Sequence, residues 1–301
     1  GGWLERHGVA APAFTGAPAA VWVEAMALLP LAVGLAMVAL DGVPDEFVDA
    51  GRLLRSDAAT LARVTFPLAT PMLLAGAGIL FALALLDYSV PTLFQVNVYA
   101  MAIFAEYSVS SDPVAALYVS LPLVAVAAST VILSQSGLRQ AAQRPSRGRP
   151  VKPTPARWPV ALRALQLAAC AVFAAQLVVL LGRLAIDVGS IRVLADNLAM
   201  ARREVAFSLG VALAAAVLAV PLACAVAPRL VAGGRASAGW WLLATLPLAV
   251  PAPLVGIGLV AAWNRPHMGG VYGSAWMPVL AGLARFTPLA IVVLVAQLRR
   301  V

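Results

Sequence analysis

The sequence predicts an all-α, polytopic bundle of about seven membrane-spanning helices, and three observations support this fold class. Of the 301 residues, 62% are hydrophobic and only 11% are charged, whereas about a quarter of an average soluble domain is charged. Seven stretches reach the roughly 20 apolar residues that a bilayer core requires. The basic residues concentrate in alternate connections between these stretches. This composition disfavours a cytosolic enzyme, a nucleic-acid-binding domain and a disordered chain.

The seven predicted spans are rich in Ala, Leu and Val and contain internal Gly and Pro, which membrane helices tolerate. Barrel strands are excluded because they alternate over only about ten residues. The predicted spans cover residues 17–40, 67–87, 114–134, 159–186, 205–228, 239–263 and 275–298.

The positions of Arg and Lys predict the orientation of the chain. Counting the first turn of the span that begins at residue 159, fourteen of the 21 basic residues lie on one side of the membrane. Six lie on the other side, including Arg183 near the end of a span, and Arg285 lies deep within a span. The positive-inside rule assigns the first side to the cytoplasm. The net charge of +8 therefore reflects topology, and no nucleic-acid partner is expected. Segment 135–158 is basic and rich in Pro and Arg, and it predicts a flexible cytoplasmic linker beside anionic lipid.

A short internal match predicts two parallel repeats, an architecture found in transporters. Leu29-Pro-Leu-Ala-Val33 resembles Thr287-Pro-Leu-Ala-Ile291, although chance remains an alternative for so short an apolar match. The expected organisation is the later part of one repeat, a linker, and the early part of a second repeat, so the chain is expected to be a fragment. The boundaries are 1–134, 135–158 and 159–301.

The connection between the first two spans has an unusual composition. Pro44 fits a first helical turn, and the acidic residues that follow it favour a helix N-terminus. Ser56 or Asp57 is predicted to cap a second short helix over 58–65. Pro67 is predicted to end this helix and to open the next membrane helix. Such a compact loop could dock in a groove of a cytosolic partner. An amphipathic loop without a partner is an equal alternative on composition alone.

This connection resembles a known loop. Pro44, the run Asp49-Ala50-Gly51 and the closing Arg63-Val-Thr-Phe-Pro67 resemble the EAA loop of inner-membrane permeases of binding-protein-dependent ABC importers (type I, methionine-permease-like superfamily). Asp49 and Gly51 replace the usual Glu and second Ala, and Arg55 replaces the usual Gly. The resemblance implies that loop 44–67 contacts ATP-binding subunits through Asp45, Glu46, Asp49, Ala50, Gly51, Arg52 and Arg55.

Other segments extend the resemblance over most of the chain outside the linker. Asp87-Tyr-Ser-Val-Pro91 is similar to a segment of the fused two-repeat permeases for ferric iron and related solutes. Residues 197–221 and 246–251, with Arg285-Phe286-x-Pro288, are similar to the second repeat. The resemblance implies a permease subunit in the bacterial inner membrane, two cytosolic ATP-binding subunits and a periplasmic solute-binding protein. Ferric iron is the first expected solute, followed by thiamine, phosphonate or polyamine.

The sequence contains no motif for covalent chemistry. Its one lysine, Lys152, is not part of a Gly-x-x-x-x-Gly-Lys-Ser/Thr motif, so ATP and Mg are expected on a partner subunit and no cofactor on this chain. His7 and His267 lack partners for a metal or catalytic site, and Cys170 and Cys224 lie in apolar runs. No catalytic or metal-binding residue is expected.

Charged residues within the spans are candidates for a translocation path, because a charge at the bilayer centre costs about 2.5–3.5 kcal/mol. Glu24 and Arg285 are expected to face the bundle interior, either as a pair or, as we favour, with separate partners. Asp87 and Tyr88 lie at an outer mouth, where they line the path or contact water. A secondary transporter with parallel repeats and a membrane-embedded enzyme or scaffold are the alternatives. The former would need intramembrane carboxylates, and the latter a clustered polar site.

Overall fold

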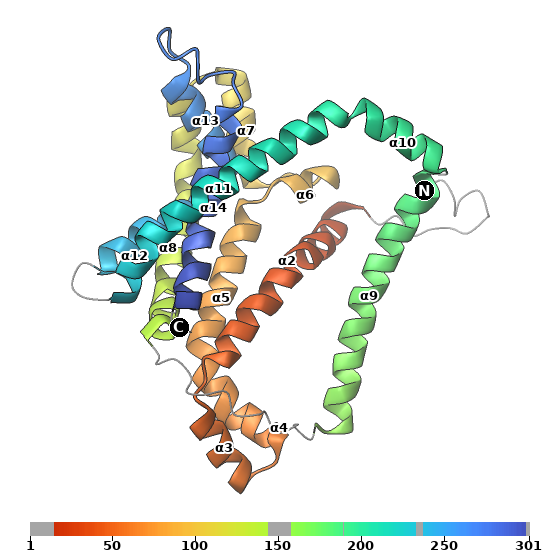
Figure 1. Cartoon of the computed structure of the whole chain (residues 1–301), viewed down its shortest axis with the longest axis vertical. Coiled ribbons are helices and arrows are strands. Elements are labelled where there is room, and N and C mark those ends of the chain that lie inside the picture. The colour runs from red at the N-terminus through yellow and green to blue at the C-terminus, as the bar shows by residue number, and fades with distance from the viewer. Residues whose placement is uncertain (1–14, 144–157, 189, 233–236, 299–301) are drawn as a thin grey trace.

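The protein is an all-helical, multi-pass membrane protein in a computed structural model that describes residues 15–143, 158–188, 190–232 and 237–298 (Figure 1). The described part contains no strand and has six helical segments long and apolar enough to cross a membrane. The all-α prediction is confirmed, while the two-repeat organisation remains a prediction. The six segments are α2 (Gly16–Asp41), α4–η1–α5 (Asp57–Leu86), α8 (Pro113–Gln143), α9 (Val160–Val188), α11 (Arg202–Ala232) and α14 (Trp276–Leu298).

Shorter helices lie at the two ends of the bundle. At the lower end of Figure 1, α3 (Asp45–Leu54) and α4 (Asp57–Thr60) connect α2 to α5 (Phe66–Leu86). Near the other end lie α6 (Ser89–Leu93), α7 (Tyr99–Ser110) and α10 (Ile191–Met200). Helix α8 continues to Gln143, so the first part of the predicted linker is helical, and residues 144–157 lie outside the described part.

The predicted span over 239–263 is not one continuous helix. The structure has α12 (Ser237–Thr245) followed by a 3₁₀ turn, η2 (Leu246–Ala249), and then α13 (Ala252–Trp263). The two halves meet at a bend of 100°, as in a broken span or a re-entrant loop. Pro247 and Pro251 flank the bend. A proline has no N–H to donate and its ring clashes with the preceding turn, which explains why this apolar run does not form one helix.

The predicted separate helix over 58–65 is also wrong in its boundaries. Helix α4 passes into a π-helical turn, η1 (Leu61–Thr65), which continues directly into α5. Pro67 lies in the first turn of α5, so the prediction that it opens the next membrane helix is confirmed, but it does not end a separate helix. The π turn shifts the helical hydrogen-bond register just before Pro67, which has no N–H to donate. Ser56 is the N-cap of α4, and its Oγ accepts a 3.4 Å hydrogen bond from Ala59 N.

Helices α11 and α14 pack through small side chains. On α11 every fourth residue from Ala215 to Ala227 is buried, and a Cβ on Gly282 of α14 would lie 3.2 Å from the Ala215 Cβ. Lipid tails are as apolar as leucine, so close backbone approach replaces the hydrophobic effect as the source of helix association. This contact continues into a core that includes Ile79 of α5 and Ile291 of α14.

Helices α5 and α8 are packed more tightly still. A Cβ on Gly137 of α8 would overlap the Pro71 carbonyl oxygen and would lie 2.7 Å from the Ala75 Cβ. A buried hydrogen bond of 2.8 Å from Gln135 Nε2 to Thr245 Oγ1 joins α8 to α12 just before the bend. The α5–α8 pair is therefore hydrogen-bonded to the first half of the bent α12–η2–α13 segment.

Helix α9 stands apart from the bundle in Figure 1. None of its most apolar 18-residue window is buried. It is joined to α2 by a 2.9 Å hydrogen bond from Trp22 Nε1 to Gln176 Oε1. Its surface is therefore available to lipid along most of its length.

We expect Gly137→Ala to destabilise the protein by about 1–3 kcal/mol, because the new methyl group must displace the α5 backbone at Pro71. Gly182→Ala on α9 is the matched control, since a Cβ there would meet nothing within 4 Å. The measurement is thermal unfolding of the purified protein by circular dichroism. Equal midpoints for both variants would contradict the close α5–α8 contact.

Candidate functional site

Helix α3 presents an exposed face that combines apolar and acidic side chains, here called the α3 surface. Phe47 is 55% exposed, Leu53 87% and Leu54 83%, although apolar side chains of this size are usually buried in water-soluble regions. The acidic residues of the first turn lie beside them. The α3 surface consists of Asp45, Glu46, Phe47, Asp49, Ala50, Leu53 and Leu54, all exposed.

The opposite face of α3 is held against α4 and η1. Gly51 is buried there, and a Cβ on it would lie 2.7 Å from the Thr60 Cγ2. Arg52 Nε lies 3.1 Å from Asp57 Oδ1, in a partly exposed ion pair of the kind worth about 0.2–1 kcal/mol. Because α4 and η1 continue into α5, the α3 surface is linked to a membrane helix through its contacts with α4 and η1.

The structure therefore divides the predicted coupling residues into two groups. Asp45, Glu46, Asp49, Ala50 and Arg55 are exposed, whereas Gly51 is buried and Arg52 is partly buried. The sequence did not distinguish these groups. Which residues are buried depends on the close approach of Gly51 to Thr60. The turn between α3 and α4 sets this approach, and the local sequence does not specify the angle of that turn.

Asp87 ends α5 and caps α6. Its Oδ1 accepts a 3.3 Å hydrogen bond from Ser89 N, and its Oδ2 accepts one of 3.2 Å from Val90 N. Burial alone would raise the pKa of Asp87, but these hydrogen bonds, with those from the side chains of Ser89 and Glu24, leave it below its usual value. Tyr88, the N-cap residue of α6, packs against the buried apolar cluster around Leu86.

Glu24 on α2 meets Asp87, not Arg285. The two carboxyl groups lie within side-chain hydrogen-bond reach of each other. The other oxygen of Glu24, Oε2, is buried and has no hydrogen-bond partner among the described residues. Within the described ranges there is no ion pair between Glu24 and Arg285. Nothing in the sequence indicated this carboxyl pair, because its members come from helices that meet only in the tertiary structure.

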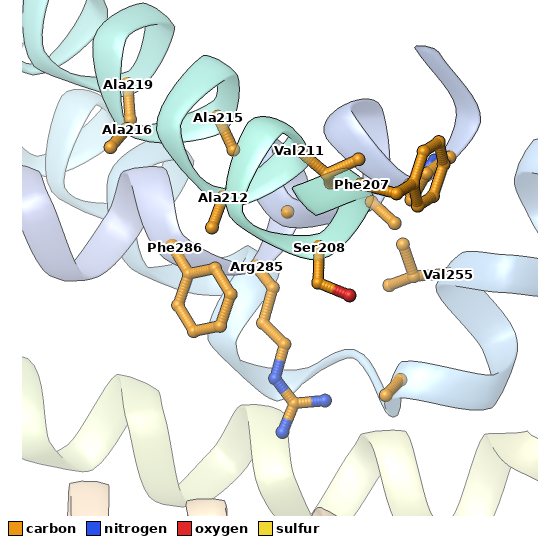
Figure 2. A pocket seen from close by; sticks show the side chains of 14 residues that line it. Phe207, Ser208, Val211, Ala212, Ala215, Ala216, Ala219, Val255, Arg285 and Phe286 are labelled. Atoms are coloured by element: carbon orange, nitrogen blue, oxygen red, sulfur yellow. The ribbon is translucent and has the colours of Figure 1, made fainter. Parts of the chain in front are cut away.

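Arg285 contributes to a cavity of about 580 Å³ between α11, α13 and α14. Figure 2 shows the Arg285 and Ser208 side chains extending to the same side of the α11 ribbon, with Phe286 beside Arg285. In the part of the chain that the structure describes, neither Arg285 nor Ser208 forms a hydrogen bond or ion pair through its side chain. Sequence reasoning identified Arg285 but missed Ser208, since a serine in an apolar helix is usually unremarkable.

No metal centre is evident: across the described ranges, no group of three or more His, Cys, Asp or Glu side chains could hold an ion. Comparison with known proteins gives no relationship from which to assign a role. No family model, no curated protein and no solved structure matches this chain.

We expect Gly51→Val to loosen α3 from α4 by forcing a branched side chain against the Thr60 methyl group. Hydrogen exchange of the α3 amides should rise by about tenfold or more. Ala50→Val is the control, because Ala50 is exposed on the adjacent position of the same helix. Unchanged α3 exchange in Gly51→Val would show that α3 is not packed as described.

We expect Asp87→Ala to fray α6, because loss of a capping carboxylate typically costs about 0.5–2 kcal/mol. The cap should be fully present above about pH 4, the pKa of a free Asp. It should weaken as the pH falls through the lower pKa of the folded carboxyl group. Hydrogen exchange of residues 89–93 measures both effects. Hydrogen exchange of residues 89–93 that changes with neither the substitution nor the pH would contradict this role. Asp112→Ala, in another outer connection, is the control.

Proposed function

We propose that the protein is the membrane-spanning permease subunit of an ATP-driven importer in a bacterial inner membrane. The observation that carries the proposal is the α3 surface. It is an exposed, part-apolar and part-acidic helix at the end of the bundle that the basic residues assign to the cytoplasm. A helix of this kind fits a groove on a soluble partner. In our proposal that partner is a pair of ATP-binding subunits, as the resemblance of loop 44–67 to the EAA loop implies.

The attachment of α3 supplies a route for mechanical coupling. A short connection joins it to α2, and the Gly51–Thr60 contact and the Arg52–Asp57 ion pair join it to the α4–η1–α5 segment. Helices α2 and α5 also touch, since a Cβ on Gly76 would lie 3.3 Å from the Leu35 Cβ. A partner that moves α3 would therefore move two adjacent membrane helices. In our proposal this motion alternates the bundle between inward-open and outward-open states, and the chain itself performs no covalent chemistry.

At the opposite end, α6, α7 and α10 would meet a periplasmic solute-binding protein. Ferric iron is the first candidate solute, followed by thiamine, phosphonate or polyamine, on the basis of the sequence resemblance alone. The two-repeat organisation, with loop 44–67 in the first repeat, is part of the same proposal.

A secondary transporter is the second candidate, and the contact between Glu24 and Asp87 favours it. Two carboxyl groups in contact can share one proton, and intramembrane carboxylates are common in proton-coupled transporters. This candidate requires transport without an ATPase, so the co-purification and uptake experiment described next separates the two proposals.

We expect the triple variant Asp45→Lys, Glu46→Lys and Asp49→Lys to reduce co-purification of an ATP-binding subunit by about tenfold or more. The reason is that charge reversal opposes the complementarity that guides docking. Co-purification is measured by ATP hydrolysis in the eluate and by mass-spectrometric detection of a polypeptide with a Gly-x-x-x-x-Gly-Lys-Ser/Thr motif.

The matched control reverses Glu106 and Asp112 to Lys at the opposite end of the bundle, where ATPase association should be unchanged. Uptake that proceeds normally without any ATP-binding subunit would exclude the importer and support the secondary transporter. Equal loss in both sets of variants would indicate a folding defect, which circular dichroism detects.

A further inference from the structure

The cavity between α11, α13 and α14 combines one positive charge with apolar walls. Its volume of about 580 Å³ lies within the range of about 300–1,000 Å³ that is typical of small-molecule sites. Aromatic side chains stand on both long helices, Phe207 on α11 and Phe286 on α14, and alanines along α11 complete the lining of the cavity (Figure 2). Such walls suit the apolar body of a bound molecule.

Arg285 lies at the middle of its span. It is the tenth of the 23 residues of α14, so about 14 Å of helix separates it from the N-terminal end and about 20 Å from the C-terminal end. A charge at this depth is unfavourable unless another group compensates it. Among the described residues none does so: Arg285 has no hydrogen bond or ion pair, and Glu204 on α11 forms no ion pair.

The chemistry of the two polar groups indicates what would compensate this charge. A guanidinium is planar and binds carboxylate or phosphate oxygens through two parallel N–H donors. The Ser208 hydroxyl, on the same side of α11 (Figure 2), can donate one further hydrogen bond. Together they match an anionic head group attached to an apolar body.

The depth of Arg285 also indicates where the anion comes from. Lipid head groups remain at the membrane surface, about 15 Å from the bilayer centre. An anion that reaches Arg285 must instead enter the bundle as a dissolved molecule. We propose that Arg285 and Ser208 form a binding site for a solute with a carboxylate, phosphate or phosphonate group.

This inference rests on the proposed transport function, because a transported solute is the molecule that has reason to enter the bundle. It refines the expected solute class. Solutes that carry an anionic group, such as a phosphonate or a ferric ion bound to an anionic chelator, fit this site better than a free cation does.

The experiment measures binding of benzoate to the full chain in phosphatidylcholine nanodiscs by isothermal titration calorimetry. Benzoate carries the anionic head and apolar body that the cavity should accept, and benzyl alcohol is the uncharged control ligand. Wild type should bind benzoate at least about tenfold more tightly than benzyl alcohol. Arg285→Gln should abolish this preference, Arg285→Lys should retain part of it, and Ser208→Ala should weaken it by a smaller factor.

Arg229→Gln is the matched control variant, because Arg229 lies over the Trp240 ring, 5.7 Å from its centroid, and does not line the cavity. It should bind benzoate as wild type does. Equal benzoate affinity in wild type and Arg285→Gln, or no binding to wild type, would overturn the proposal. If phosphatidylglycerol in the nanodisc displaces benzoate, the site takes lipid head groups and the proposal also fails.

The outcome is separable from that of the importer proposal. An ATP-binding subunit that co-purifies while wild type shows no preference for benzoate would reject only the anion site. Preferential benzoate binding without any such subunit would retain the site and reject the ATP-driven mechanism. Arg285→Lys keeps the inference testable if Arg285→Gln does not fold.

Discussion

Close contact between small side chains is the constraint on which the bundle depends. In a membrane, burial of apolar surface gives little reason for one apolar helix to prefer another over lipid. The alanines along α11 and the glycines at the α5–α8 and α11–α14 contacts allow backbones to approach closely enough for dispersion and local hydrogen bonds to hold them. Helix α9, none of whose most apolar window is buried, stands outside these two helix pairs.

Two departures from regular α-helix position the α3 surface and the cavity at Arg285. The π turn at Leu61–Thr65 keeps α4 continuous with α5, so the segment against which α3 packs is part of a membrane helix. The bend between η2 and α13 has the opposite effect, because it interrupts an apolar run and leaves α13 beside α11 and α14 as a wall of the cavity. Both departures lie next to prolines, whose missing N–H weakens the ordinary helical hydrogen-bond ladder.

Charged side chains occur in three different environments, and their partners differ in each. Arg52 and Asp57 pair at the surface, where water also solvates them. Glu24 and Asp87 meet at the end of α5, where the free N–H groups of α6 hold the Asp87 carboxylate. Arg285 lies at mid-span with no partner in the described chain. This third arrangement leaves a positive charge beside a cavity without a partner among the described residues.

Composition and charge pattern were sufficient to predict the class of protein, the approximate position of the six long helices, the acidic start of α3 and the Ser56 cap. These features depend on local properties, namely runs of apolar residues, capping side chains and the bias of basic residues. The bend at Pro251, the continuity through Pro67, the contact of Glu24 with Asp87 and the cavity at Arg285 required the tertiary structure. Each of them depends on which helix faces meet, and in uniformly apolar helices the sequence carries little amphipathic pattern to indicate those faces.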